Sequence, residues 1–141
     1  MARGSVRREV RIERPAAEVW DLVGDPARVA EWFPGIVAAT VDGSTRVVTL
    51  ASGVPMPEEI VTCDPVTRRF QYRITAPMVT EHLSTIDVFE LDDDSCLVSY
   101  GCDASPATIA LVIGGAGGHA LHTLRDGLEA ERRDTQPEGT T

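Results

Sequence analysis

The sequence of 141 residues contains no lysine, so its strongly basic side chains are all arginine, and 13 of them stand against 22 acidic residues. The formal net charge is −9 at pH 7. Nucleic acids and anionic membranes are bound through clustered cations. This charge balance argues against both as main partners.

Long apolar segments are also missing. The first ten residues, MARGSVRREV, lack the apolar core of a signal peptide, and no apolar run approaches the roughly 20 residues that span a bilayer. We therefore expect a cytoplasmic protein without a membrane span.

Cysteine is scarce, with only Cys63, Cys96 and Cys102 present, and these show neither a CxxC pair nor Cys/His metal spacing. Cys96 and Cys102 fall in one predicted strand, about 20 Å apart and beyond disulfide reach. The sequence also lacks GxSxG, P-loop, dinucleotide and HExxH motifs. We expect free thiols and none of the enzyme classes that these motifs mark.

Alternation of apolar and polar residues predicts seven strands. Turn signals such as Asp42-Gly43 separate them. Two short helices, Ala16–Val23 and Ala27–Phe33, are predicted after the first strand. The predicted strands are Val6–Arg14, Ile36–Val41, Arg46–Ala51, Glu58–Cys63, Phe70–Thr75, Glu81–Leu91 and Cys96–Ala104.

The segment Pro106–Arg133 has the apolar period of a long helix, so one stripe of it should be buried against the sheet. The stripe consists of Ile109, Val112, Ile113, Ala116, Ala120, Leu121, Leu124 and Leu128. Together these elements predict an α+β fold in which a long C-terminal helix covers an antiparallel sheet. Residues 1–133 are expected to form one domain, and the polar segment 134–141 a disordered tail.

Four glycines, Gly114, Gly115, Gly117 and Gly118, occupy the middle of this helix. Each costs about 1 kcal/mol relative to alanine in a helix interior. The helix could be thinned there to leave a cavity or entrance. Alternatively, a large side chain such as Trp32 or Tyr100 fills the gap, or the helix breaks in two.

Polar side chains also fall on the sheet face that should look at the long helix. On the last three strands the inward polar residues are Tyr72, His82, Ser84 and Tyr100. The fourth strand is ambiguous, because placing Val61 inward also places Glu59 inward. That choice predicts one cross-strand row, made of Glu59, Ile74, His82 and Ala104.

This row suggests a site for acid/base catalysis. Glu59 and His82 could act as a general acid/base pair in enolisation, aldol cyclisation or dehydration, with Tyr72 or Tyr100 donating to an oxyanion. The tyrosines could equally orient the polar end of a ligand, or simply bond to a neighbour. A buried structural Glu–His pair is the plainer alternative.

Other candidate contacts lie on the helices. Trp32 and Phe33, beside Pro34-Gly35, are expected at a cavity mouth, or packed against the long helix. His119 and His122 have a spacing that could bind metal, but no carboxylate or thiol is placed near them, so we favour a polar helix flank and expect no metal or cofactor. The remaining expected ligand contacts are Ser84, Ile109, Ile113 and Gly117.

Several segments resemble the START-related, Bet v 1-like (SRPBCC) superfamily, specifically its bacterial polyketide cyclase/dehydrase-like group. Val10–Phe33, VRIERPAAEVWDLVGDPARVAEWF, resembles the opening strand and helix pair. Glu59–Ile74 resembles the central hairpin, and His82–Ala104 the last, with Tyr100 where an aromatic is common. The resemblance covers Val6 to Glu131. It implies a helix-grip fold (β-α-α-β-β-β-β-β-β-α), whose curved sheet and C-terminal helix enclose a cavity.

The resemblance leaves the activity open, because the same cavity serves lipid carriers, hormone receptors and cyclases. We expect a binding or carrier protein for a hydrophobic small molecule: a lipid, polyketide or aromatic metabolite. A cyclase, aromatase or dehydratase using acid/base residues in the cavity is the first alternative. A protein-interaction module with an acidic surface is the second. A monomer or weak homodimer is expected.

Overall fold

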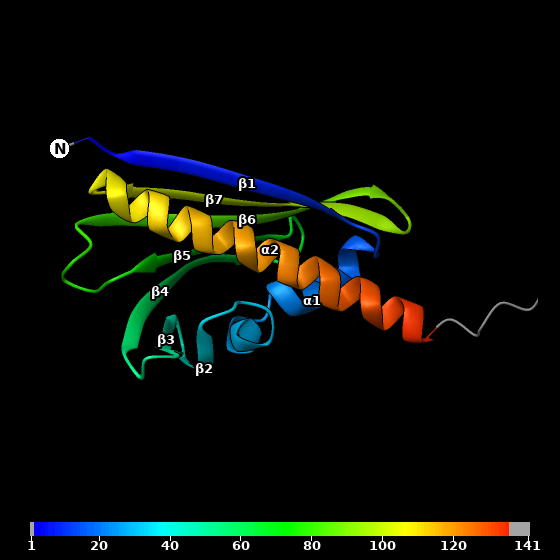
Figure 1. Ribbon diagram of the computed structural model, residues 1–141, viewed down its shortest axis with the longest axis horizontal. Helices are drawn as coiled ribbons and strands as arrows, with labels where there is room; N and C mark the ends of the chain where they lie inside the picture. Colours follow the sequence, from blue (N-terminus) through cyan, green and yellow to red (C-terminus); the bar gives the residue numbers. More distant parts are fainter. Residues whose placement is uncertain (1, 136–141) are drawn as a thin grey trace, which may run out of the picture.

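The computed structural model describes residues 2–135, which form a seven-stranded antiparallel sheet with a long helix lying across it (Figure 1). The strand order is β1-β7-β6-β5-β4-β3-β2. This confirms the predicted helix-grip fold. The elements are β1 (Gly4–Ile12), α1 (Ala16–Val23), η1 (Pro26–Glu31), β2 (Ile36–Asp42), β3 (Thr45–Leu50), β4 (Pro55–Asp64), β5 (Arg69–Ile74), β6 (Glu81–Asp92), β7 (Ser95–Ser105) and α2 (Ala107–Thr135).

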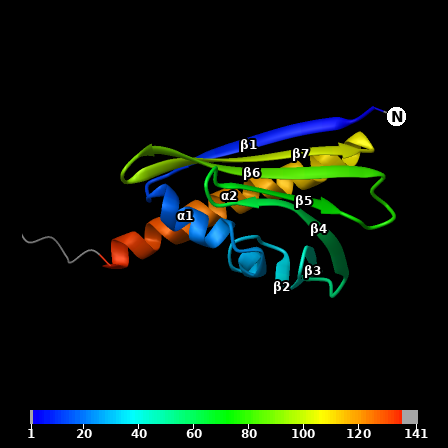
Figure 2. The same ribbon diagram turned by 180° about the vertical axis from the view of Figure 1, so that it is seen from behind.

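The short helices follow local signals. Pro15 precedes α1, and the Asp25 carboxylate accepts the Ala27 N–H at 3.1 Å to begin η1. The second predicted helix is a six-residue 3₁₀ helix rather than an α-helix, which suits so short a connecting segment. Both elements lie beside the C-terminal half of α2 (Figure 2).

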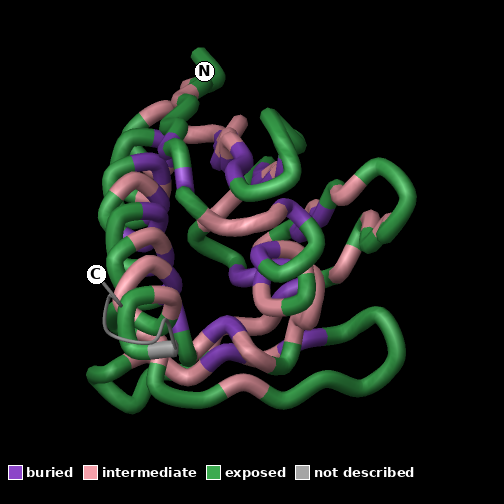
Figure 3. Tube along the Cα trace, turned by 90° about the vertical axis from the view of Figure 1, so that its right-hand side faces the viewer, coloured by how far each residue is buried: buried purple, intermediate pink, exposed green. Residues whose placement is uncertain are grey.

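The core lies on the concave face of the sheet, where alternate residues of β6 and β7 point inward as the pattern predicted. Figure 3 shows the buried segments turned toward the interior. The C-terminal half of α2 packs there through Leu121, Leu124 and Leu128. By length and composition alone α2 could cross a membrane, since its most apolar window has a mean hydropathy of 1.2. Because these leucines are buried in the core, we interpret α2 as a core helix.

The glycines of α2 bring the helix close to the sheet. A Cβ on Gly114 would lie 2.5 Å from a methyl of Val6 in β1, and one on Gly117 would lie 2.9 Å from the Tyr100 ring in β7. The helix is continuous, which excludes the alternative of a helix broken in two. Tyr100, and not Trp32, occupies the space left by Gly117.

This close approach changes which face of α2 is buried. In the N-terminal half, Ala110, Gly114 and Gly117 are buried, whereas Val112 is 70% exposed and Ala116 is also exposed. The predicted stripe is therefore wrong for Val112 and Ala116 and confirmed in the C-terminal half. The reason is that glycine adds nothing to an apolar pattern and yet permits the shortest distance between helix and sheet.

Helix α2 includes residues 134 and 135, and residues 136–141, the rest of the predicted tail, lie outside the described residues. The three cysteines are free thiols. Cys96 and Cys102 are buried, but Cys63 is exposed, with its Sγ 3.2 Å from the Gly24 carbonyl oxygen.

Candidate ligand-binding site

Helix α2 packs against β1 and β7, at one side of the sheet. The concave face over β3–β5 is left uncovered, and it borders a cavity of about 480 Å³. Most of the lining is apolar, and only Ser52, Glu58 and Tyr72 contribute polar side chains. The lining residues are Phe33, Pro34, Gly35, Ile36, Val48, Leu50, Ala51, Ser52, Met56, Glu58, Tyr72, Ile74, Val112, Ile113 and Ala116.

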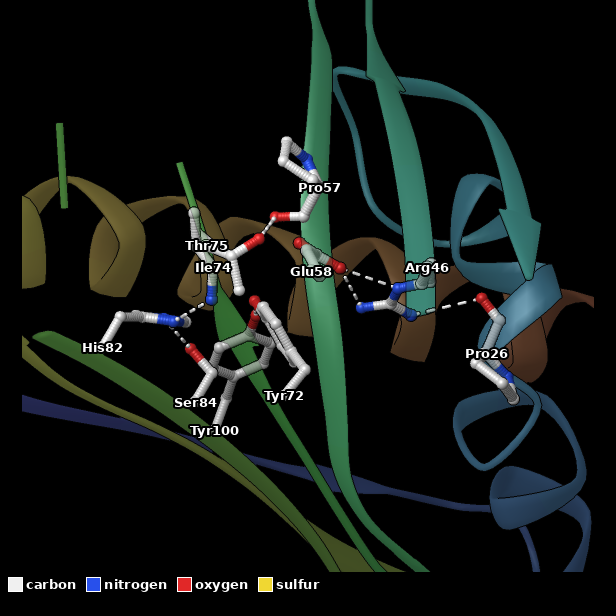
Figure 4. Close-up of polar contacts among 10 residues, drawn as sticks. All are labelled: Pro26, Arg46, Pro57, Glu58, Tyr72, Ile74, Thr75, His82, Ser84 and Tyr100. Carbon is white, nitrogen blue, oxygen red and sulfur yellow. Dashed lines mark hydrogen bonds and ion pairs between the residues drawn. The ribbon is translucent and has the colours of Figure 1, made fainter. Parts of the chain in front are cut away.

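Glu58, which lines this cavity, belongs to a buried ion pair. Arg46 of β3 and Glu58 of β4 face each other across the hairpin, being 3% and 5% exposed. Nε and Nη2 of Arg46 both lie 2.7 Å from Oε1 of Glu58 (Figure 4). Burial raises the pKa of the Glu58 carboxyl, and the Arg46 charge opposes that rise.

The Arg46 guanidinium is held on every side. Its Nη1 donates to the Pro26 carbonyl oxygen at 3.2 Å. Its central carbon lies 5.2 Å from the Phe70 ring centroid and 5.0 Å from the Tyr72 ring centroid. Arg46 thus joins η1 to the sheet, and its charge is shared between Glu58 and two aromatic faces.

The predicted inward position of Glu59 is wrong. Glu59 lies on the exposed outer face of β4, where Arg73 approaches it at 3.3 Å. A β-bulge between Ile60 and Thr62 shifts the alternation, so that Val61 is 41% exposed instead of inward. Glu58, paired with Ile74, takes the inward place that the pattern gave to Glu59.

His82 is buried, and both of its ring nitrogens are hydrogen-bonded to groups other than a carboxylate. Its Nδ1 accepts the Ile74 backbone N–H at 2.8 Å, so the neutral ring carries its proton on Nε2 and donates it to Ser84 Oγ at 2.8 Å. Burial, and then the Arg73 charge, lower the pKa of His82 to about 4. His82 and Ser84 lie outside the cavity lining, and the predicted Glu59–His82 acid/base pair does not form.

The two tyrosines meet at the inner end of the site. The Tyr72 hydroxyl is hydrogen-bonded to the Tyr100 hydroxyl (Figure 4). Burial raises the pKa of Tyr72 to about 12 and that of Tyr100 well above its usual value, so both are neutral phenols at neutral pH. Tyr72 reaches the cavity, whereas Tyr100 borders a separate void of about 10 Å³ behind it.

The other predicted contacts divide between cavity and core. Phe33 and Ile113 line the cavity. Trp32 packs 5.8 Å from Phe33, ring to ring, and its Nε1 is buried without a partner in residues 2–135. Ile109 packs beside Ala110 in a small secondary cluster, and Gly117 contacts Tyr100.

Sequence reasoning missed the ion pair. The sequence nevertheless contains a signal for it. Glu58 is two residues from both Met56 and Ile60, and Arg46 is two residues from Val48, which is the spacing of side chains on one face of a strand. A charge set among inward apolar residues on neighbouring strands indicates a buried pair.

The two helix histidines do not build a metal site. His119 and His122 are exposed on α2. Within residues 2–135, no three His, Cys, Asp or Glu side chains are grouped to hold a metal ion.

A sheet gripping a C-terminal helix, with an apolar cavity between them, defines a protein of the helix-grip fold. The chain belongs to the family described as "Polyketide cyclase / dehydrase and lipid transport", whose model matches residues 3–133. No curated protein matches the sequence.

Solved structures share the fold. XoxI from Bacillus cereus is 25% identical, with a TM-score of 0.81 over 93% of this chain and 99% of that one. A START superfamily protein from Mycobacterium smegmatis is 15% identical, with a TM-score of 0.70 over 94% and 99%. The di-domain ARO/CYC BexL is 18% identical, with a TM-score of 0.76 over 89% of this chain and 46% of that one. The last two show the fold alone.

Proposed function

We propose that this protein binds a hydrophobic small molecule, such as a lipid, polyketide or aromatic metabolite, in the cavity between the sheet and α2, and carries it unchanged. The observation that carries this proposal is the cavity of about 480 Å³ with its largely apolar lining. Ligand sites typically have volumes of about 300–1,000 Å³ and combine apolar walls with few polar groups. The family description, which includes lipid transport, supports the same function.

Native mass spectrometry of the purified protein tests this proposal. We expect a retained small molecule, or the uptake of an added neutral probe such as 1-pyrenebutanol, at one molecule per chain. A Trp at position 116 would fill the cavity from its helix wall, so Ala116→Trp should lose the bound mass. Leu111→Trp is the matched control, because Leu111 is 65% exposed on the same helix and outside the lining. A wild-type protein that takes up no apolar probe would refute the proposal.

A second candidate function is an enolisation or dehydration catalysed without a cofactor. The observation that favours it is the Glu58 carboxyl, which lines the cavity beside Tyr72. Burial raises the pKa of this carboxyl. Such a carboxyl could exchange a proton with a β-keto substrate while a tyrosine hydroxyl donates to the developing oxyanion. The acid/base role first given to Glu59 and His82 passes to Glu58, and Tyr72 keeps the oxyanion role first given to it.

Conversion of a short poly-β-keto thioester, followed by mass spectrometry and absorbance, separates the two functions. If the protein is a cyclase, the rate of product formation should fall at least tenfold in Glu58→Gln and in Tyr72→Phe. Glu59→Gln is the control and should keep the wild-type rate. A carrier should bind the substrate and return it unchanged.

A further inference from the structure

The cavity presents a negatively charged side chain to a ligand and no positively charged one. Glu58 lines the cavity and Arg46 does not. Both 2.7 Å contacts between them end on Oε1 of Glu58. The other carboxylate oxygen, Oε2, is directed away from Arg46 (Figure 4). The ionised atom available to a bound molecule is therefore a carboxylate oxygen.

Arg46 is not free to turn toward an anionic ligand. It is 3% exposed, it donates to the Pro26 carbonyl at 3.2 Å, and its guanidinium lies against the rings of Phe70 and Tyr72. Moving it would break these contacts and leave Glu58 unpaired in a buried site. The cation thus lies behind the anion as seen from the cavity.

The remaining polar group in the inner wall is neutral. Tyr72 reaches the cavity with a hydroxyl that is already bonded to Tyr100. Ser52 lies at the turn after β3. Neither side chain supplies a positive charge to balance a second carboxylate.

We infer that the bound molecule places a neutral hydroxyl, an alcohol or a phenol, against Oε2 of Glu58, and that the site discriminates against a carboxylate at the same end. This inference rests on the proposed binding function. A hydroxyl donates a charge-assisted hydrogen bond to the free oxygen. A carboxylate would instead bring a like charge into a site where burial weakens the screening by water.

The test compares 1-pyrenebutanol with 1-pyrenebutyrate, which share a ring system and chain and differ at the polar end. Fluorescence titrations at pH 8 keep the butyrate ionised. We expect the wild-type protein to bind the alcohol at least tenfold more tightly. An apolar pocket by itself prefers an alcohol, so the decisive quantity is the change in this ratio when Glu58 is altered.

Glu58→Gln removes the negative charge and leaves that of Arg46, so the ratio should fall at least tenfold or reverse. If this variant fails to fold, the double variant Arg46→Met, Glu58→Gln removes both charges, and its ratio should still fall several-fold. Glu59→Gln, on the outer face, should keep the wild-type ratio. A ratio unchanged in the Glu58 variants would overturn this inference and leave the carrier function standing. Failure of the wild-type protein to bind either probe would overturn both.

Discussion

At the scale of single residues, neighbouring glutamates of β4 have opposite environments. Glu58 is buried against Arg46, whereas Glu59 meets Arg73 on the exposed face. Removing one partner of a buried ion pair leaves an uncompensated charge away from water, but an exposed pair contributes little. The two positions therefore form a natural comparison within one strand.

We expect Glu58→Gln to lower the free energy of unfolding by about 3 kcal/mol, because the Arg46 charge remains buried without its carboxylate. Glu59→Gln should lower it by less than about 1 kcal/mol. Urea denaturation followed by circular dichroism measures both. Equal effects at the two positions would contradict the assignment of the inward residue.

His82 predicts a pH dependence of stability. Its pKa is about 4 in the folded protein and 6.5 in an ordinary environment. Between these values the unfolded chain takes up a proton that the folded chain refuses, so stability is lost as the pH falls through that window. From pH 7.5 to pH 5 the loss due to this group should be about 2 kcal/mol.

His82→Gln isolates this effect, since the amide can still accept the Ile74 N–H and has no proton to gain. Unfolding free energies of this variant should fall less between pH 7.5 and pH 5 than those of the wild-type protein. For the control variant His119→Gln, on the exposed surface of α2, the unfolding free energy should fall by as much as that of the wild-type protein. A His82→Gln variant with the wild-type slope would show that His82 is not the responsible group.

At the scale of elements, the glycines of α2 have different roles at neighbouring positions. Gly114 faces β1, where a Cβ would lie 2.5 Å from Val6, whereas Gly115 faces open space. Gly114→Ala should lower the free energy of unfolding by about 1–3 kcal/mol, the usual cost of overpacking. Gly115→Ala should raise it by about 0.5–1 kcal/mol, because alanine is the better helix former. Thermal denaturation of the two variants should give melting temperatures that move in opposite directions.

The same helix shows what the sequence could predict. Apolar periodicity identified α2, and regular alternation identified the inward faces of β6 and β7. Two features broke these periods. The bulge at Val61 moved an apolar residue outward and Glu58 inward, and the glycines buried a face of α2 that carries little apolar surface. Both depend on how close one element lies to another, which a local pattern does not contain.

At the scale of the whole molecule, the sheet has two unequal sides. β1, β7 and β6 are covered by α2 and α1, and β7 alternates buried residues along its whole length. β2 is the opposite edge strand, has no fully buried residue, and contacts η1 and β3. A strand with few buried contacts opens locally at lower free energy than the core. The cavity lies next to this less covered side, so we expect local opening there to admit the proposed ligand.

Hydrogen exchange measured by mass spectrometry should reveal this difference. Amides of β2 should exchange roughly 100-fold faster than those of β6 and β7, because this edge strand opens without global unfolding. Peptides from the same digest provide the internal control. Saturation with 1-pyrenebutanol should slow exchange in β2, β3 and the N-terminal half of α2 most, since residues 33–36, 48, 50–52, 112, 113 and 116 border the cavity. Exchange that is equally slow in both halves, or protection by the probe confined to β1 and β7, would contradict entry and binding at this side of the sheet.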